Sequence, residues 1–207
     1  MSVRRIFLAR HGNRQDFVDP RWLDQAEEPY DPPLSADGVE QARGLGRRLA
    51  GEGITAIVAS PYLRTIQTAH HANEALAVPI HLEPAFGEWL AGDSFERLPR
   101  LQPRALLAGR YPRLGEGYVA SGSLCHPETL EQVRERAQRG LRELVRQLNG
   151  TLLVVGHAAS VVALASLDPK ALSVPCPMCA LFCLEHQGTR WRLSINGEVA
   201  HALPPRR

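Results

Sequence analysis

A histidine flanked by arginines, in the segment Arg10-His11-Gly12-Asn13-Arg14, directly follows a short apolar stretch near the N-terminus. A neutral imidazole is a competent nucleophile toward phosphorus, and it needs nearby positive charge to hold the phosphoryl oxygens. Arg10 and Arg14 supply such charge, which also lowers the pKa of His11 and keeps its ring neutral. We expect Gly12 to let the backbone approach a ligand closely. Alone, the motif is equally compatible with a structural histidine among surface arginines.

Three further side chains are candidates for the same chemistry. His157 follows the apolar run Thr151–Val155 and precedes an apolar helix pattern, so its imidazole and the helix N-terminus both suit an anion. Arg64 lies inside a predicted helix, where a solvated arginine is the usual case. Glu88 precedes Trp89, and an apolar wall there is expected to raise its pKa, as suits a general acid. The alternatives are a buried structural histidine and a surface carboxylate.

Four segments in order resemble the motifs of the histidine phosphatase superfamily, which includes phosphoglycerate mutases and acid phosphatases. They are Leu8–Gly12, Ser60–Ala69, Glu83–Trp89 and Val154–Ser160. The resemblance extends from about Val3 to Ile195 and is weakest over Trp89–Pro127.

This resemblance implies a role for each candidate residue. His11 is the nucleophile that forms a covalent phosphohistidine, Glu88 is the general acid and base, and His157 also takes part in catalysis. The phosphate-binding residues that it implies are Arg10, Arg14, Arg64 and His157. Because these groups supply the positive charge, no metal and no other cofactor is expected.

The sequence is most similar to the Sts (UBASH3) phosphatase domains within the superfamily. Arg14 matches their arginine three residues after the nucleophile, and Glu88-Trp89 and the histidine motif that begins at His157 match as well. Two positions differ: Asn13 replaces a glutamate of many relatives, and Ala158 replaces a glycine. Neither difference affects the nucleophile or the arginines.

The apolar patterns predict strands that alternate with helices. The predicted strands are Val3–Ala9, Ile54–Ala59, Val78–Leu82, Thr151–Val155, Cys179–Glu185 and Trp191–Ile195. The predicted helices begin near Asp37, where Asp37 and Glu40 have capping-box spacing, after Ser60-Pro61 as cap and first turn, at Glu128, and after His157. This order predicts a three-layer α/β/α fold with a mainly parallel central sheet, in which ligands bind beyond the carboxyl ends of the strands.

The domain organisation follows from the same patterns. We predict one domain over residues 1–207, with an insertion or lid over residues 89–127 that lies above the active site. Five arginines in this insertion form a solvated face or help to select an anionic substrate: Arg97, Arg100, Arg104, Arg110 and Arg113.

Composition limits the possible partners and locations. The 207 residues are 44% hydrophobic and carry a formal net charge of +2, which is too small to indicate binding to nucleic acid or to a membrane surface. No apolar run is long enough to cross a bilayer, and no signal peptide is visible, so a cytoplasmic protein is expected. Cys176, Cys179 and Cys183 are more simply explained as buried thiols than as a zinc site.

The sequence therefore predicts a metal-independent phosphatase that hydrolyses phosphomonoesters, either small molecules or proteins. The alternatives are a phosphoglycerate mutase-like phosphomutase and a non-catalytic phospholigand-binding domain. The physiological substrate and the oligomeric state are not predicted.

Overall fold

A computed structural model describes residues 2–169 and 175–202, whose six strands form one sheet in the order β3-β2-β4-β1-β5-β6. The strands are β1 (Val3–Arg10), β2 (Ile54–Ala59), β3 (Ile80–Leu82), β4 (Gly150–Gly156), β5 (Leu181–Gln187) and β6 (Arg190–Glu198). The pairs β3–β2, β2–β4 and β4–β1 are parallel, whereas β5 runs antiparallel to β1 and β6. The mainly parallel sheet predicted from the sequence is confirmed.

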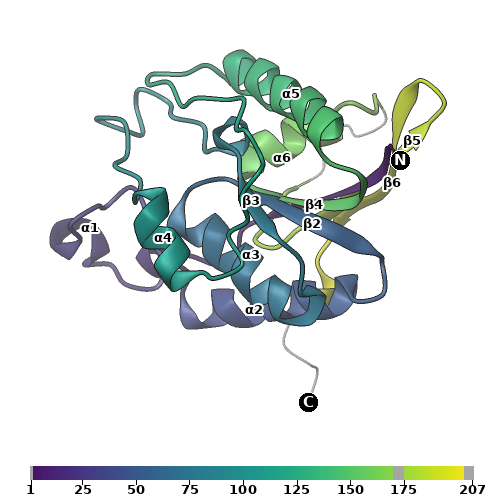
Figure 1. Cartoon of the computed structure of the whole chain (residues 1–207). Coiled ribbons are helices and arrows are strands. Elements are labelled where there is room, and N and C mark those ends of the chain that lie inside the picture. Colours follow the sequence, from purple (N-terminus) through teal and green to yellow (C-terminus); the bar gives the residue numbers. More distant parts are fainter. Residues whose placement is uncertain (1, 170–174, 203–207) are drawn as a thin grey trace.

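Helices cover both faces of the sheet (Figure 1). They are α1 (Trp22–Gln25), α2 (Ala36–Leu49), α3 (Leu63–Leu76), α4 (Arg104–Arg110), α5 (Leu130–Gln147) and α6 (Ala158–Ala165). Alternate residues of β1 face opposite layers: Ile6 and Leu8 pack with α5 and α6, and Phe7 packs with α2 and α3. This alternation produces the predicted three-layer α/β/α fold.

The predicted cap of α2 is wrong by two residues. Ser35 is the N-cap, and its hydroxyl oxygen accepts a hydrogen bond from the Gly38 N–H at 3.3 Å. Asp37 instead accepts from the Ser35 hydroxyl at 2.6 Å. Ser and Asp are both good caps, so local sequence alone does not separate these neighbouring candidates.

The predicted cap of α3 is also wrong. Ser60 does not cap the helix; its hydroxyl lies 3.0 Å from Nε2 of His157. The helix begins at Leu63, whose N–H donates to the carboxylate of Asp31 at 2.8 Å. A residue distant in the sequence therefore satisfies this helix end.

The segment 89–127 joins the domain through both its core and one buried carboxylate. Leu107, Tyr111 and Leu114 are buried beside β3, and Leu114 forms an isolated parallel bridge with Ile80. The fully buried Glu83 accepts five hydrogen bonds, from Ala85, Tyr118, Gly122 and twice from Ser121. Within the segment 89–127, residues 89 and 91–96 line a cleft beside the carboxyl ends of the strands. None of the helices in the described part of the chain is long and apolar enough to cross a membrane.

Candidate active site

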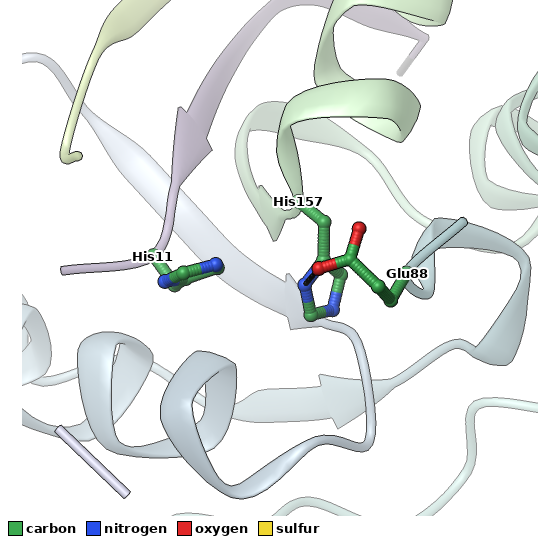
Figure 2. A group of neighbouring side chains, drawn as sticks. All are labelled: His11, Glu88 and His157. Carbon is green, nitrogen blue, oxygen red and sulfur yellow. Dashed lines mark ion pairs between the residues drawn. The ribbon is translucent and has the colours of Figure 1, made fainter. Parts of the chain in front are cut away.

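Two neighbouring parallel strands place His11 and His157 side by side. Arg10 and Gly156 are register partners at the ends of β1 and β4, and a histidine follows each. The two ring centroids are 5.2 Å apart, and both side chains are fully buried. Figure 2 shows one ring nitrogen of His11 pointing toward the pair formed by Glu88 and His157.

The ring of His11 is held in the form that a nucleophile needs. Its Nδ1 lies 2.8 Å from the Gly12 carbonyl oxygen, so Nδ1–H donates and Nε2 retains its lone pair. Nε2 is buried and has no hydrogen-bond partner among the described residues. Burial, together with Arg64 and His157, holds the pKa of His11 well below its usual value. The ring is therefore neutral, as expected from the sequence.

Gly12 makes a close backbone contact, although not the one expected. A Cβ at this position would lie 2.6 Å from the carbonyl oxygen of Gly38 near the start of α2. The glycine thus allows the segment after the nucleophile to pack against α2, and the close neighbour is protein backbone instead of a ligand.

Arg64, Glu88 and His157 form a compact polar group. Nη2 of Arg64 lies 3.1 Å from the Glu88 carboxylate and 3.3 Å from Nδ1 of His157. The same carboxylate lies 3.2 Å from that Nδ1 (Figure 2). Burial lowers the pKa of His157 to about 4, so this ring contributes hydrogen bonds and not positive charge near neutral pH.

The expected high pKa of Glu88 is wrong. Burial does raise it, but a hydrogen bond with the neutral His157 ring and the charge of the Arg64 guanidinium outweigh burial and hold the pKa of Glu88 well below its usual value. Trp89 does not supply a purely apolar wall, because its indole N–H donates to the Glu128 carbonyl oxygen and its backbone N–H to Glu88. The carboxyl group is therefore ionised in the ligand-free protein.

The guanidinium groups of the buried Arg64 and the half-buried Arg10 retain buried donors without hydrogen-bond partners among the described residues. Arg64 is 1% exposed, and its Nε and Nη1 make no hydrogen bond, although Nη1 lies 3.8 Å from the Asp31 carboxylate; Nε of Arg10 also makes no hydrogen bond. Nη1 of Arg10 donates to the Cys176 carbonyl oxygen at 2.6 Å, which fixes the side chain. Buried donors in native proteins are almost always satisfied, so these groups indicate a site for an anionic ligand.

Arg14 is not part of this buried group. Its guanidinium forms two bonds to Asp16, at 3.0 and 2.5 Å, and lies over the ring of Phe17. It lines the outer cleft, and its predicted role in phosphate binding requires that this ion pair open.

Sequence reasoning missed two buried interactions that support the site. Asp31, besides capping α3, lies 3.8 Å from Nη1 of Arg64, and burial raises the pKa of Asp31 to about 6. Arg136 of α5 forms a two-point ion pair with Glu128 and donates to the carbonyl oxygens of Ala85, at 2.8 Å, and Glu88, at 3.0 Å. A possible signal for Arg136 was its place on the apolar face of α5.

The geometry also permits a cation at one place. Ligand atoms of His11, Glu88 and His157 lie within 4.8 Å of one another, and no other such group occurs in residues 2–169 and 175–202. The adjacent guanidinium groups of Arg10 and Arg64 repel a divalent ion and favour an anion. The cysteines are free thiols, and Cys179 and Cys183 are buried.

A cleft of about 790 Å³ opens outward from Arg64 and Glu88. Its walls come from residues 14–32 on one side and from residues 89 and 91–96 on the other. The cleft ends at Arg64 and Glu88, which contact His157, and neither His11 nor His157 lines it.

The fold is an α/β fold, and its buried histidine–arginine group lies at the carboxyl ends of two parallel strands. Residues 6–197 match the Histidine phosphatase superfamily (branch 1), and the chain belongs to that family.

Its relatives include both phosphatases and mutases. The chain is 30% identical to the uncharacterized phosphatase PhoE of Bacillus subtilis, over 94% of this chain and 96% of that protein. It is 26% identical to the probable phosphoglycerate mutase GpmB of Serratia proteamaculans, over 97% and 95%. Mouse ubiquitin-associated and SH3 domain-containing protein A is 29% identical over 88% of this chain, which spans only 35% of that protein.

A solved structure has the same fold. The ecdysone phosphate phosphatase of Bombix mori, in complex with tungstate, superposes with a TM-score of 0.70 at 22% identity, over 99% of this chain and 95% of that chain. The predicted likeness to the Sts group and to phosphoglycerate mutases is therefore confirmed.

Proposed function

We propose that this protein is a metal-independent phosphatase that hydrolyses phosphomonoesters through a covalent phosphohistidine on His11. The observation that carries the proposal is the buried, unpartnered Nε2 of His11 beside the unpartnered guanidinium donors of Arg64 and Arg10. A lone pair and anion-binding donors in one buried place fit nucleophilic attack on a phosphoryl group.

In the first step, Nε2 of His11 forms a bond to phosphorus while the bond from phosphorus to the alcohol oxygen breaks. Arg10 and Arg64 neutralise the equatorial oxygens, and His157 contributes hydrogen bonds. Glu88 gives the leaving oxygen a proton. Because Glu88 is ionised before substrate binds, that proton arrives with the phosphomonoester, whose second pKa is about 6. The negative charge of the bound phosphate raises the pKa of Glu88 and allows the transfer.

In the second step, Glu88 acts as a base. It takes a proton from water while the water oxygen attacks phosphorus and the bond to Nε2 breaks. Inorganic phosphate leaves, and His11 returns to its neutral form. Arg14 joins the phosphate-binding residues if substrate displaces Asp16.

One relative favours a second candidate. The likeness to the probable mutase GpmB over nearly the whole chain supports a phosphomutase, in which the phosphoryl group returns to an organic hydroxyl. Incubation with 3-phosphoglycerate separates the two, because a phosphatase releases inorganic phosphate whereas a mutase forms 2-phosphoglycerate.

His11→Ala is expected to abolish turnover of p-nitrophenyl phosphate without unfolding the protein, because it removes the only atom that bonds to phosphorus. Wild type quenched during turnover should carry an acid-labile, alkali-stable phosphoryl label that the variant lacks. His71→Ala, which removes a histidine paired with Glu74 on α3, is the matched control. Activity should survive exhaustive EDTA treatment and be inhibited by vanadate. Substantial activity in His11→Ala, or an absolute need for added Zn²⁺, would contradict the mechanism.

The cytoplasmic location and the expectation that neither nucleic acid nor a membrane is a partner remain predictions from the sequence.

A further inference from the structure

Apolar and aromatic side chains form about half of the lining of the cleft outside the buried histidine–arginine group. The cleft begins at Arg64 and Glu88, and its volume of about 790 Å³ greatly exceeds that of a phosphoryl group. Volumes of this size are typical of sites that enclose a drug-sized organic molecule. The apolar lining consists chiefly of Leu23, Pro29, Tyr30, Pro32, Trp89 and Phe95.

The aromatic part of this wall is fixed by its neighbours. The rings of Tyr30 and Phe95 come from different lining segments and contact each other, with centroids 5.2 Å apart. The guanidinium of Arg97 lies 5.4 Å from the Tyr30 ring and pairs with Glu28. Nε2 of His126 lies 2.7 Å from the Phe95 carbonyl oxygen. A wall that is already ordered costs little entropy when a ligand packs against it.

The charges in the cleft oppose a second anionic group on the substrate. Of the described residues that line it, the only cations are Arg14 and Arg64, which are paired with Asp16 and Glu88. The exposed carboxylates of Asp93 and Glu96 add negative charge near the mouth. None of the five arginines of the insertion that were candidates for anion selection lines the cleft.

We infer that the cleft selects phosphomonoesters of bulky apolar or aromatic alcohols and disfavours alcohols that carry a carboxylate or a second phosphate. This inference rests on the proposed phosphatase function. The phosphoryl group enters the buried centre, and the alcohol portion packs against the lining side chains of Tyr30, Phe95 and Trp89. Transfer of its apolar surface out of water lowers the transition-state free energy, whereas a carboxylate there faces like charges.

Three phosphate esters of primary alkyl alcohols test this selection with matched leaving groups. We expect kcat/KM to be at least about tenfold higher for 3-phenylpropyl phosphate than for propyl phosphate, since even small apolar groups are worth this factor in a fitted pocket. We expect 3-carboxypropyl phosphate to be the slowest of the three. Equal rates for the phenyl and propyl esters, or a preference for the carboxyl ester, would overturn the inference. No turnover of any ester would overturn the phosphatase proposal itself.

The binding affinity of non-hydrolysable analogues tests the apolar cleft in the absence of catalysis. By calorimetry, 3-phenylpropylphosphonate should bind at least about tenfold more tightly than propylphosphonate. The same affinity for both would contradict the apolar cleft even in a fully active enzyme.

Substitutions locate the effect in the cleft. Phe95→Ala should lower the phenylpropyl-to-propyl ratio of kcat/KM several-fold, whereas Phe95→Leu, which keeps an apolar side chain, should retain most of the preference. Val119→Ala truncates an exposed side chain outside the cleft and should leave the ratio unchanged. Asp93→Asn should raise the relative rate on the carboxyl ester about twofold to fivefold at low salt. An unchanged ratio in Phe95→Ala would place the preference elsewhere.

Discussion

Glu88 is ionised in a site where its proposed role requires a proton. The carboxylate lies against Arg64 and His157, and these contacts outweigh its burial. In the proposed mechanism, the proton for the leaving oxygen therefore comes from the substrate monoanion. The fraction of substrate in this form falls as the pH rises above the second phosphate pKa of about 6. In the proposed mechanism, the Glu88 carboxyl group is therefore protonated only in the complex with substrate.

Glu88→Gln is expected to slow propyl phosphate by about 10²–10⁴-fold and p-nitrophenyl phosphate much less, because a nitrophenolate leaves nearly without a proton. In wild type, kcat/KM should fall about tenfold per pH unit above about pH 6, and the variant should lose this limb. The measurement is kcat/KM between pH 4.5 and 8.5 for both esters. If both esters slowed by the same factor, Glu88 would position substrate instead of donating a proton, and Asp93 or Glu96 would become the candidate acid.

At the scale of elements, helix α5 holds the segment that carries Glu88. Arg136 donates to carbonyl oxygens along residues 84–88 and pairs with Glu128, whose own backbone bonds to Trp89 and Leu90. The fork of a guanidinium reaches several acceptors at once, which the single ammonium of lysine does not. Arg136 is therefore a positioning residue for Glu88.

Arg136→Lys should lower kcat for propyl phosphate about tenfold and affect p-nitrophenyl phosphate less, because a displaced Glu88 fails mainly as an acid. Arg136→Ala leaves the buried Glu128 charge unpaired and should cost about 3–5 kcal/mol in the free energy of unfolding. Steady-state kinetics and urea denaturation separate these effects. Arg139→Lys, on the exposed face of the same helix, is the control. Equal losses on both esters in Arg136→Lys would indicate general damage to the site.

The elements that were predicted well are those encoded locally. Buried strands such as β1 and β4 appear as continuous apolar runs, and the motif residues His11 and His157 follow them directly. Asp31 and Glu83 were missed because their partners lie far away in the sequence, on α3 and in residues 118–122. Ser60 was misassigned for the same reason, since its contact with His157 crosses between strands. Polar contacts between residues far apart in the chain produce no periodic pattern in the amino-acid sequence, so they cannot be predicted from it.

At the scale of the whole molecule, several buried groups couple folding to pH. Burial lowers the pKa of His157 to about 4, so an unfolded chain takes up a proton at about pH 6.5 where the folded protein does not. The contribution of His157 to stability is therefore complete above pH 6.5 and is lost as the pH falls toward 4. Asp31 acts in the opposite direction, because its pKa is raised to about 6 and the folded protein binds that proton first.

His157→Gln should flatten the decrease in the free energy of unfolding between pH 6.5 and 4 by up to about 3 kcal/mol, since one pKa unit corresponds to about 1.4 kcal/mol. Asp31→Asn should make the decrease steeper than in wild type, because it removes the opposing group. Urea denaturation at half-unit pH steps measures both. Parallel curves for wild type and His157→Gln would show that His157 does not titrate differently on folding.

Two buried glutamates, Glu83 and Glu128, anchor the segment 89–127 at both of its ends. Glu83 fastens residues 118–122, and Glu128 fastens Trp89 and Leu90. Neither anchor uses the side chains of residues 91–97, which line or border one wall of the cleft. Substitutions in residues 91–97 can therefore change the cleft without disturbing the Glu83 and Glu128 contacts or the residues around His11. Under the proposed function, substitutions in residues 91–97 should change which alcohols the cleft accepts before they change which bond is broken.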